Sequence, residues 1–512
     1  MTPEQKARQE IDRLLKAAGW DVQNREEMNL FNPNKPGVAV REAHLKTGFA
    51  DYLLFVQGKA LGVVEAKKVG TTLSGVETQS ARYAVGLQAH MKAWIPAEPL
   101  PFRYESTGVK TYFTNTLDPE PRSRRVFAFH RPEMLAAWAQ ESSTLRQRLQ
   151  QMPPLANDKL WDVQHRAIIN LEQSLAHDRP RALVQMATGS GKTFTAVSAV
   201  YRLIKHADAR RVLFLVDRTN LGKQALNEFA NFVTPDDGRK FAEIYNIRHL
   251  TNNAINVEGD VNRVYISTIQ RLYAMLRDEE LEDETEARSL YETEEKGEAA
   301  RTQRTVTFDG KLPIEFFDVI IVDECHRSIY TIWRQVLEYF DAYFIGLTAT
   351  PSKQTIGFFD QNLVMEYTHE DAVADGINVP GEVYRILTRI SDRGSTVEAG
   401  YTIEKMDKLT REEWQHKLDE DLTYTPEQLD RDVVSMDQIR TIVAHYRDVL
   451  FTKLFPDRQQ QVVPKTLIFA KDDNHAENIV RIVREEFGKG NEFCQKITYK
   501  AVGNPEEILQ DF

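Results

Sequence analysis

The sequence predicts an α/β protein built on a doubly wound parallel sheet, and two observations indicate this class. Short, uniformly apolar segments alternate with helix-like segments between residues 161 and 351, as expected for parallel strands that helices cover on both faces. A glycine-rich turn also joins the first apolar segment directly to a helix-like stretch. The apolar segments comprise residues 182–184, 212–216, 264–266, 319–322 and 344–347.

The glycine-rich turn, residues 186–193, reads Met-Ala-Thr-Gly-Ser-Gly-Lys-Thr. A strand that turns through glycines into a helix directs backbone N–H groups and the positive end of the helix dipole at one point, where a polyphosphate can bind. Lys192 can reach the β- and γ-phosphates of ATP, and the Thr193 hydroxyl can ligate Mg²⁺. Met186 stands where the strict pattern has glycine. The predicted nucleotide-binding residues of this turn are Thr188, Gly189, Ser190, Gly191, Lys192 and Thr193.

An acidic pair, Asp323 and Glu324, follows the apolar segment 319–322. Parallel sheets place their ligand groups at the carboxyl ends of buried strands. Asp323 is suited to hold Mg²⁺, and Glu324 to orient or deprotonate the water that attacks the γ-phosphate. A lone pair of acids is common on surfaces, but this pair follows the phosphate-binding turn by about 130 residues within the same alternating region. The combination predicts nucleotide hydrolysis.

The composition is that of a soluble protein of about three domains, with 512 residues of which 42% are hydrophobic and 28% charged. No apolar stretch approaches the roughly 20 residues of a membrane span, and the first residues lack the apolar core of a signal peptide. We therefore expect a cytoplasmic protein with no membrane partner. Two cysteines, Cys325 and Cys494, exclude a disulfide framework, and Cys325 is expected to be buried at a strand end.

The net charge of −11 argues at first against a nucleic-acid partner. Residues 278–298, however, hold eleven acidic and two basic residues, and their net charge of −9 leaves the rest of the chain near −2. A local basic channel therefore remains compatible with the sequence. The acidic run itself is expected to be a solvated loop or a helical excursion within a domain.

These segments resemble motifs of superfamily 2 helicases and translocases. Residues 323–326, Asp-Glu-Cys-His, resemble the DECH box, and residues 347–351, Leu-Thr-Ala-Thr-Pro, resemble motif III, which links the nucleotide state to the nucleic-acid track. The resemblance implies a RecA-like lobe in which Gln164 reads adenine. It also implies that residues within 216–221 and 267–271 contact the sugar-phosphate backbone. The implied motor-coupling and DNA-track residues are His326, Thr348, Thr350, Arg218 and Thr268.

The N-terminal region carries a different chemistry. Residues 49–56 and 60–67 read as two strands separated by Gln-Gly-Lys, a hairpin signal that places Asp51 opposite Val64 and Glu65. Glu65 and Lys67 are two residues apart on one strand and so point to the same face. Two carboxylates can bind Mg²⁺ for phosphodiester hydrolysis, and a lysine can stabilise the developing negative charge. The pattern alone would also suit a cluster of surface charges.

Gln79 and Tyr83 follow on a helix-like segment, and with the hairpin they resemble the PD-(D/E)xK nuclease fold in its QxxxY subgroup. That subgroup often adds an acid from the first helix, here residues 4–18, which points to Glu10. A nuclease of this kind before a DECH translocase resembles the restriction (R) subunits of type I restriction-modification enzymes, and residues 126–133 support the resemblance.

The resemblance implies an ATP-dependent translocase and endonuclease subunit that cleaves unmethylated double-stranded DNA away from its recognition site. Its implied partners are modification (methyltransferase) and specificity subunits. Motifs V and VI are not found, so we expect only the start of a second motor lobe. A stand-alone repair helicase-nuclease, an RNA helicase and a non-catalytic nucleotide-dependent binding switch remain alternatives. The predicted divisions are a nuclease domain (1–130), a helical linker (131–155), a first RecA-like lobe (156–355) and the second lobe (356–512). We expect one helix over residues 134–151 in the linker, and a strand at 466–469 followed by a helix at 476–486 in the second lobe.

Overall fold

The computed structural model places the chain in two compact units, Met1–Pro380 and Gly381–Phe512. Within the described residues, no helix is long and apolar enough to span a membrane. The structure describes residues 3–498 apart from residues 34, 72, 74–76, 97, 157–158, 282–285, 287–304, 328–332, 385, 387–394, 398–401, 407–412, 418–421, 425–435 and 459–461.

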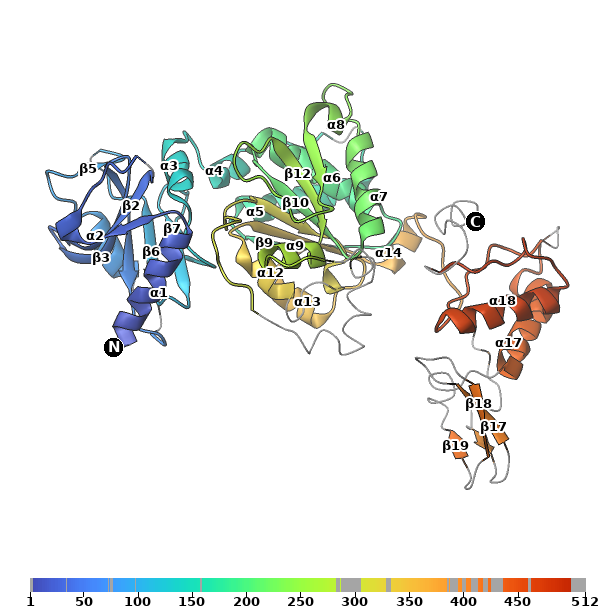
Figure 1. Ribbon diagram of the computed structural model, residues 1–512. Helices are drawn as coiled ribbons and strands as arrows, with labels where there is room; N and C mark the ends of the chain where they lie inside the picture. Colours follow the sequence, from blue (N-terminus) through green and yellow to red (C-terminus); the bar gives the residue numbers. More distant parts are fainter. Residues whose placement is uncertain are drawn as a thin grey trace. The chain divides into compact units, whose positions relative to one another are not determined.

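The N-terminal part of the first unit is a mixed sheet with helices on both faces (Figure 1). Helix α1 (Pro3–Ala17) packs Ile11 and Leu15 against one face, and helix α2 (Glu77–Ala84) packs Ala84 against the other. Strands β4 and β6 are parallel and α2 lies in the crossover between them, which completes an α/β/α arrangement. The strands in spatial order are β1 (Asp21–Gln23), β2 (Gly37–Leu45), β3 (Gly48–Val56), β4 (Lys59–Ala66), β6 (Phe102–Ser106), β7 (Thr111–Asn115) and β8 (Arg124–Val126), with β5 (Lys92–Ala93) also beside β4.

The predicted hairpin is confirmed as β3 and β4. Its turn consists of Gln57 and Gly58, both with positive φ (50° and 75°), the backbone that a two-residue hairpin turn requires. The register pairs Tyr52 with Val64, so Asp51 lies one position beyond this pair, beside Glu65. The turn therefore brings the two predicted carboxylates to the same end of the hairpin.

The linker contains two helices rather than the single helix predicted for residues 134–151. Helix α3 (Pro132–Gln140) ends where Glu141 adopts an extended backbone, with ψ of 140°. Helix α4 (Leu145–Gln150) begins behind Thr144, whose hydroxyl accepts a hydrogen bond from the Gln147 backbone N–H. The capping box that Thr144 forms with Gln147 starts a new helix at this point.

The second sheet of this unit has seven strands, all parallel, as predicted for the motor lobe. The five predicted apolar segments form its central strands, and β11 and β15 complete its edges. Because parallel strands end at one edge, the glycine-rich turn after β9 and Asp323 after β13 share that edge, separated by β14. In spatial order the strands are β11 (Asn246–His249), β12 (Asn262–Thr268), β10 (Val212–Val216), β13 (Val319–Val322), β14 (Tyr343–Thr348), β9 (Arg181–Met186) and β15 (Leu363–Tyr367).

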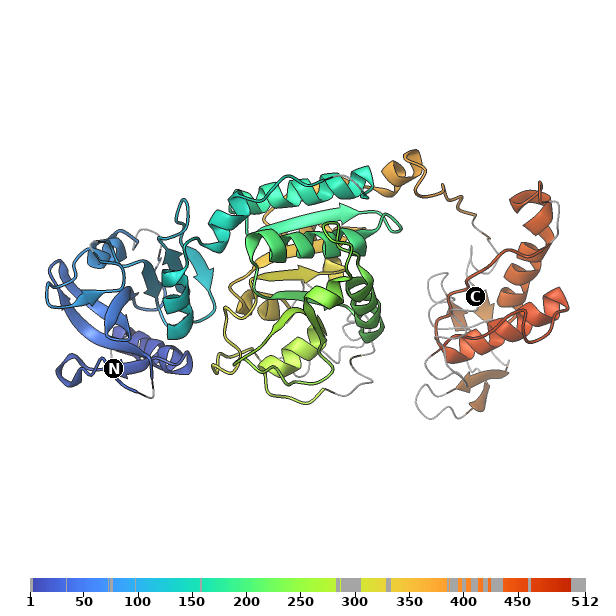
Figure 2. The same ribbon diagram turned by 90° about the horizontal axis from the view of Figure 1, so that it is seen from above.

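Helices cover both faces of the parallel sheet, as the doubly wound class requires (Figures 1 and 2). One apolar layer joins the sheet to the long helices that follow Trp161, and a second joins it to the helices beyond β12. The first face carries α5 (Asp162–Ala176), α6 (Lys192–Ala207) and α7 (Thr219–Asn231), and the second carries α9 (Ile269–Leu276), α12 (Trp333–Tyr339) and α13 (Lys353–Phe358). The shorter helices are η1 (Arg25–Glu27), α8 (Phe241–Ile244), η3 (Cys325–Arg327) and α14 (His369–Ala374).

The first lobe continues past the predicted boundary at residue 355. Strand β15 pairs in parallel with β9, and α14 follows it within the same unit. The edge position explains why sequence patterning misses this strand: Glu366 is exposed within it, so the segment lacks the uniformly apolar character of the central strands.

The second unit contains two antiparallel strand pairs and two packed helices among its described residues. The helix predicted for residues 476–486 is confirmed as α18 (Asp473–Phe487), which packs on α17 (Met436–Val449) through Ile482 and Val443. The strand predicted at residues 466–469 does not form, and Phe469 is 86% exposed. A parallel strand needs neighbours for its backbone, and no described segment supplies one here. The remaining elements are β16 (Ser395–Val397) with β19 (Leu422–Tyr424), β17 (Thr402–Met406) with β18 (Glu413–Lys417), and the π-helix η4 (Leu450–Leu454).

Candidate functional site

The glycine-rich turn has the geometry of a phosphate cradle. It leaves β9 after Met186 and enters α6 at Lys192, so its backbone lies at the positive end of a 16-residue helix. Gly189 and Gly191 have φ of 86° and 80°, in the left-handed region that favours glycine. A Cβ at Gly191 would lie 2.4 Å from Gln164 Nε2, so the turn has no room for a side chain there. The chain thus fits a polyphosphate, with Thr193 in the first turn of the helix.

Two side-chain amides hold backbone carbonyls of the turn. Gln164 donates from Nε2 to the Ser190 carbonyl at 3.2 Å and accepts from the Trp161 N–H at 3.1 Å, so the predicted adenine-reading residue here braces the turn. Asn378 donates from Nδ2 to the Thr188 carbonyl at 3.0 Å, a contact that the sequence did not predict. Inside the turn, the Ser190 hydroxyl donates to the Ala187 carbonyl at 2.6 Å.

The acidic pair stands at the carboxyl end of β13. The Asp323 N–H donates to the Leu215 carbonyl at 2.9 Å, which extends the ladder to β10, and Glu324 turns away with a φ of 47°. Burial, and then the charge of Glu324, raise the pKa of Asp323 to about 6, while the charge of Lys192 opposes them. A carboxylate that is held in a dry site near a lysine and a phosphate cradle suits a hard cation, so these residues fit Mg²⁺.

Asp323→Asn is expected to stabilise the fold in the absence of Mg²⁺ and nucleotide. The folded carboxyl holds its proton more tightly than the unfolded one, so the parent protein loses stability as the pH rises from about 4 to about 6. Asparagine does not titrate, so the stability advantage of Asp323→Asn over the parent should reach about 3 kcal/mol at pH 8. Urea denaturation in EDTA at pH 5 and pH 8 measures this advantage. An equal gain at both values would show that ionisation of Asp323 is not its cause.

The DECH segment and the motif III segment are in direct contact. His326 Nδ1 lies 2.9 Å from Thr348 Oγ1, at the end of β14, and 3.4 Å from Glu324 Oε2. The Thr350 N–H donates to the same Thr348 hydroxyl at 3.1 Å. Burial lowers the pKa of His326, which favours the neutral ring. The side chain next to the acidic pair is thus linked through Thr348 to the segment that follows β14.

The two predicted DNA-track residues differ in their exposure. Arg218 precedes α7 and is partly exposed, with its Nε 3.6 Å from Asp217 Oδ2. Thr268 is buried: its hydroxyl caps α9 through the Arg271 N–H and donates to Glu286 Oε1 at 2.6 Å. Glu286 belongs to the acidic run expected to be solvated, yet it is buried beside Arg271. A DNA phosphate therefore cannot reach the Thr268 hydroxyl in this arrangement.

The hairpin brings Asp51, Glu65 and Lys67 together. Asp51 Oδ2 accepts a hydrogen bond from the Ala66 N–H at 2.8 Å, and Lys67 Nζ donates to Glu65 Oε1 at 2.7 Å. Burial is the main cause that raises the pKa of Glu65, and the charge of Asp51 adds to it. The second oxygen of Glu65 is buried without a hydrogen-bond partner. An orphaned carboxylate oxygen beside a second carboxylate fits a divalent cation, although no set of three metal-ligating side chains occurs among the described residues.

The α1 residue that contacts Asp51 is Arg8 rather than the predicted Glu10. Arg8 NH2 lies 2.6 Å from Asp51 Oδ1, and Arg8 NH1 lies 2.8 Å from Glu42 Oε1. Glu10 instead pairs with Arg13 at 2.6 Å, one turn further along the helix. Residues two apart on a helix point in different directions, so α1 cannot present both Arg8 and Glu10 to the hairpin.

Helix α2 carries the two QxxxY positions. Tyr83 lies against Gly48, where a Cβ would be 3.3 Å from its ring, while the side chain of Gln79 falls outside the described residues. The Ser80 hydroxyl donates to the buried carboxylate of Glu105. Strand β6 places Glu105 in register with Glu65, which links α2 to the strand that carries the predicted catalytic residues.

Each of the two sheets contains a match to a known protein family. A family profile described as "Type III restriction enzyme, res subunit" matches residues 157–353, and one described as "Type I restriction enzyme EcoKI endonuclease subunit second domain" matches residues 31–109. The EcoKI endonuclease subunit of Escherichia coli K12 is 27% identical over 95% of this chain. Over nearly its whole length, the chain is similar to type I restriction enzyme endonuclease subunits.

The chain spans about half the length of the curated relatives it matches. It covers 44% of the EcoKI subunit and 54% of the EcoAI subunit of Escherichia coli, to which it is 25% identical over 94% of its own length. A fragment structure of an HsdR subunit from Vibrio vulnificus YJ016 is 18% identical with a TM-score of 0.35, and the match covers 95% of this chain and 75% of that one.

Part-buried ion pairs join the N-terminal sheet to the parallel sheet. Arg124 donates to both oxygens of Asp341, at 2.7 and 2.8 Å, and His130 Nε2 lies 2.8 Å from Asp341 Oδ2. Arg131 Nε lies 3.1 Å from Glu315 Oε1. Burial raises the pKa of Asp341. The charge of Arg124 and the hydrogen bond to His130 outweigh burial and hold this pKa well below its usual value. We call these five residues the charged joint.

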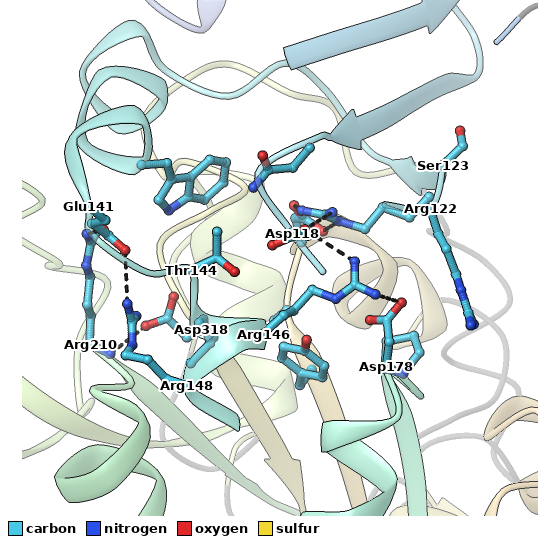
Figure 3. A pocket seen from close by; sticks show the side chains of 18 residues that line it. Asp118, Arg122, Ser123, Glu141, Thr144, Arg146, Arg148, Asp178, Arg210 and Asp318 are labelled. Atoms are coloured by element: carbon cyan, nitrogen blue, oxygen red, sulfur yellow. Dashed lines mark hydrogen bonds and ion pairs between the residues drawn. The ribbon is translucent and has the colours of Figure 1, made fainter. Parts of the chain in front are cut away.

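A cavity of about 280 Å³ lies beside the charged joint and is itself lined by charges (Figure 3). Arg146 points toward Asp118 and Asp178, and Arg210 pairs with Glu141. Acids balance the arginines around this cavity, so it has the character of a polar seam between the two sheets rather than an anion site.

The sequence did not predict three residues at these sites, because contacts between distant parts of the chain place them there. Arg8 has no sequence signal beyond its place on an amphipathic helix. Glu105 lies within the short strand β6, and only the order of strands in the sheet reveals its register with Glu65. Asn378 lies in Gly-Ile-Asn-Val-Pro, which reads as a turn, and only the edge position of β15 brings it to the phosphate cradle.

Proposed function

We propose that this chain is the ATP-dependent translocase and endonuclease subunit of a type I restriction enzyme. The observation that carries the proposal is the presence, in one compact unit, of a phosphate cradle with its acidic pair and a separate carboxylate–lysine hairpin. The similarity to type I restriction enzyme endonuclease subunits supports this assignment. The proposed substrates are ATP and unmethylated double-stranded DNA, cut away from the recognition site, and the proposed partners are modification and specificity subunits in the cytoplasm.

At the motor site, the turn backbone and Lys192 hold the phosphates, and Thr193 and Asp323 would hold Mg²⁺. Glu324 would orient the attacking water, because it follows Asp323 directly and turns out of the sheet. The contact from His326 to Thr348 gives a route by which a change at the γ-phosphate reaches the segment after β14.

At the nuclease site, Asp51 and Glu65 would hold a second Mg²⁺, which supplies polarisation of the phosphodiester and activation of water. Lys67 lies on the same face and would stabilise the negative charge that develops on the phosphate. Arg8 balances the charge of Asp51, so we expect it to share this carboxylate with the cation.

Cleavage assays on the assembly of this chain with its modification and specificity subunits test the proposal. The DNA would be an unmodified phage genome and the same genome after methylation by the complete enzyme. We expect ATP-dependent cleavage of the first substrate only. Cleavage by the chain without partners would favour a stand-alone nuclease, and ATP-controlled DNA binding without hydrolysis would favour a binding switch.

A further inference from the structure

Asn378 lies on the phosphate cradle although it follows the acidic pair by more than 50 residues. Its Nδ2 donates to the Thr188 carbonyl at 3.0 Å. Its Oδ1 would lie 3.0 Å from a Cβ placed on Gly189, so the amide packs directly against the first glycine of the turn. None of the predicted nucleotide-site residues comes from this part of the chain.

The support for Asn378 is rigid and made of short-range contacts. The Ala187 N–H donates to the Tyr367 carbonyl at 2.9 Å, so the end of β15 is bonded to the start of the turn. A capping box at Thr368 begins α14, and the backbone N–H of Asn378 returns to the Ala372 carbonyl at 2.9 Å. The Tyr367 hydroxyl donates to Asp375 Oδ2 at 2.9 Å and ties the strand to the end of the helix.

The geometry of the peptide unit shows what this contact does. A trans peptide is planar, so its C=O and the following N–H point in opposite directions. By holding the Thr188 carbonyl outward, Asn378 directs the Gly189 N–H away from itself. Gln164 holds the Ser190 carbonyl in the same way and so directs the Gly191 N–H. The side-chain amides of Gln164 and Asn378 thus orient the N–H groups of Gly191 and Gly189. Gln164 precedes the turn in the sequence, and Asn378 lies close to the end of the first unit.

We propose that Asn378 is a positioning residue of the nucleotide site, which orients the Gly189 N–H toward the phosphates of a nucleoside di- or triphosphate. This role of Asn378 rests on the proposed nucleotide site, and it requires neither the nuclease nor the partner subunits. The chain leaves the first unit at Pro380, two residues after Asn378. Binding free energies are reciprocal. If the contact of Asn378 with the turn strengthens nucleotide binding, bound nucleotide must equally stabilise that contact, close to where the chain leaves the first unit.

The test is binding of fluorescent mant-ATP and mant-ADP, with Mg²⁺, to the full 512-residue chain. Asn378→Ala should weaken both nucleotides about fivefold, the usual effect of one lost hydrogen bond. Asn378→Asp should weaken them more than alanine does, because the carboxylate cannot donate to the Thr188 carbonyl and adds a negative charge beside the phosphates. The excess loss should shrink as the salt concentration rises.

Asn231→Ala is the matched control, since Asn231 Nδ2 also donates to a backbone carbonyl at 3.0 Å, that of Asn227, within the same lobe. Its nucleotide affinity should stay within twofold of the parent. His369→Ala is a second variant for the case that substitutions at position 378 prevent folding. His369 is exposed, and its Nδ1 lies 3.3 Å from Asn378 Nδ2. Removing this contact should weaken nucleotide binding about twofold.

Unchanged affinity in Asn378→Ala would overturn the proposal, as would an equal loss in Asn231→Ala. A purely structural role would give the near-isosteric aspartate the milder effect, with no dependence on salt, and this result would also overturn it. If neither Asn378 variant folds, unchanged affinity in His369→Ala decides against the proposal.

Discussion

Replacing Lys192 or Asp323 by alanine is expected to stop ATP hydrolysis by the assembled enzyme. Lys192 is the first residue of α6, and its charge acts on Asp323. Lys192→Ala removes a positive charge from the phosphates, and Asp323→Ala removes a ligand of the proposed Mg²⁺. Loss of such a group costs a thousandfold or more in rate, about 4 kcal/mol of transition-state stabilisation. A steady-state ATPase assay with duplex DNA measures the effect.

Cleavage of unmethylated DNA should stop in the same two variants if, as proposed here, the nuclease cuts only after ATP-driven translocation. Lys205→Ala is the matched control: Lys205 lies on the same helix but pairs with Asp236, far along the chain from the cradle. Sustained cutting by a variant without ATPase activity would show that the motor and the nuclease act independently.

Alanine at Asp51, Glu65 or Lys67 is expected to abolish DNA cleavage and to leave ATP hydrolysis intact. The three side chains lie on one hairpin outside the parallel sheet, so their loss removes metal ligands or a phosphate-stabilising charge without touching the motor. The expected loss is roughly a thousandfold or more in cleavage rate. Conversion of supercoiled to linear DNA, measured beside the ATPase rate, separates the two activities.

Lys68→Ala provides the control for Lys67, because the neighbouring lysine is exposed and follows directly in the chain. It should cut DNA at the parent rate. Full cleavage by any of the three hairpin variants would remove that residue from the nuclease site. Loss of ATPase together with cleavage would indicate misfolding, and a restriction phenotype unchanged in Lys67→Ala would favour a binding switch.

Local sequence patterns predicted the parts of these sites that depend on short stretches of chain. The strand, glycine turn and helix around Lys192 are consecutive, and so are the strand and acids that end at Glu324. The hairpin that joins Asp51 to Glu65 also closes through two turn residues. In each case the spacing of residues determines the geometry with little help from distant contacts.

Long-range packing decided the positions where prediction was wrong or incomplete. Glu10 shares a helix with Arg8, and only the docking angle of α1 determines which of them reaches Asp51. Thr268 has the polar character of a DNA contact, yet Glu286 covers it from a segment whose charge suggested solvent exposure. Asn378 depends on an edge strand that lacks the uniform apolar pattern of its neighbours.

Domain exchange between relatives would meet an obstacle at the charged joint. Arg124 comes from the last strand of the N-terminal sheet and Arg131 from the start of the linker, whereas Asp341 and Glu315 come from the parallel-sheet side. A transplanted N-terminal domain would bring its arginine to a recipient that must already carry both acids, and a missing acid would leave a part-buried arginine without that partner, at a cost of about 1 to 2 kcal/mol. The two sheets therefore have to match at this seam, and a working chimera would have to carry both sides of the seam from one parent.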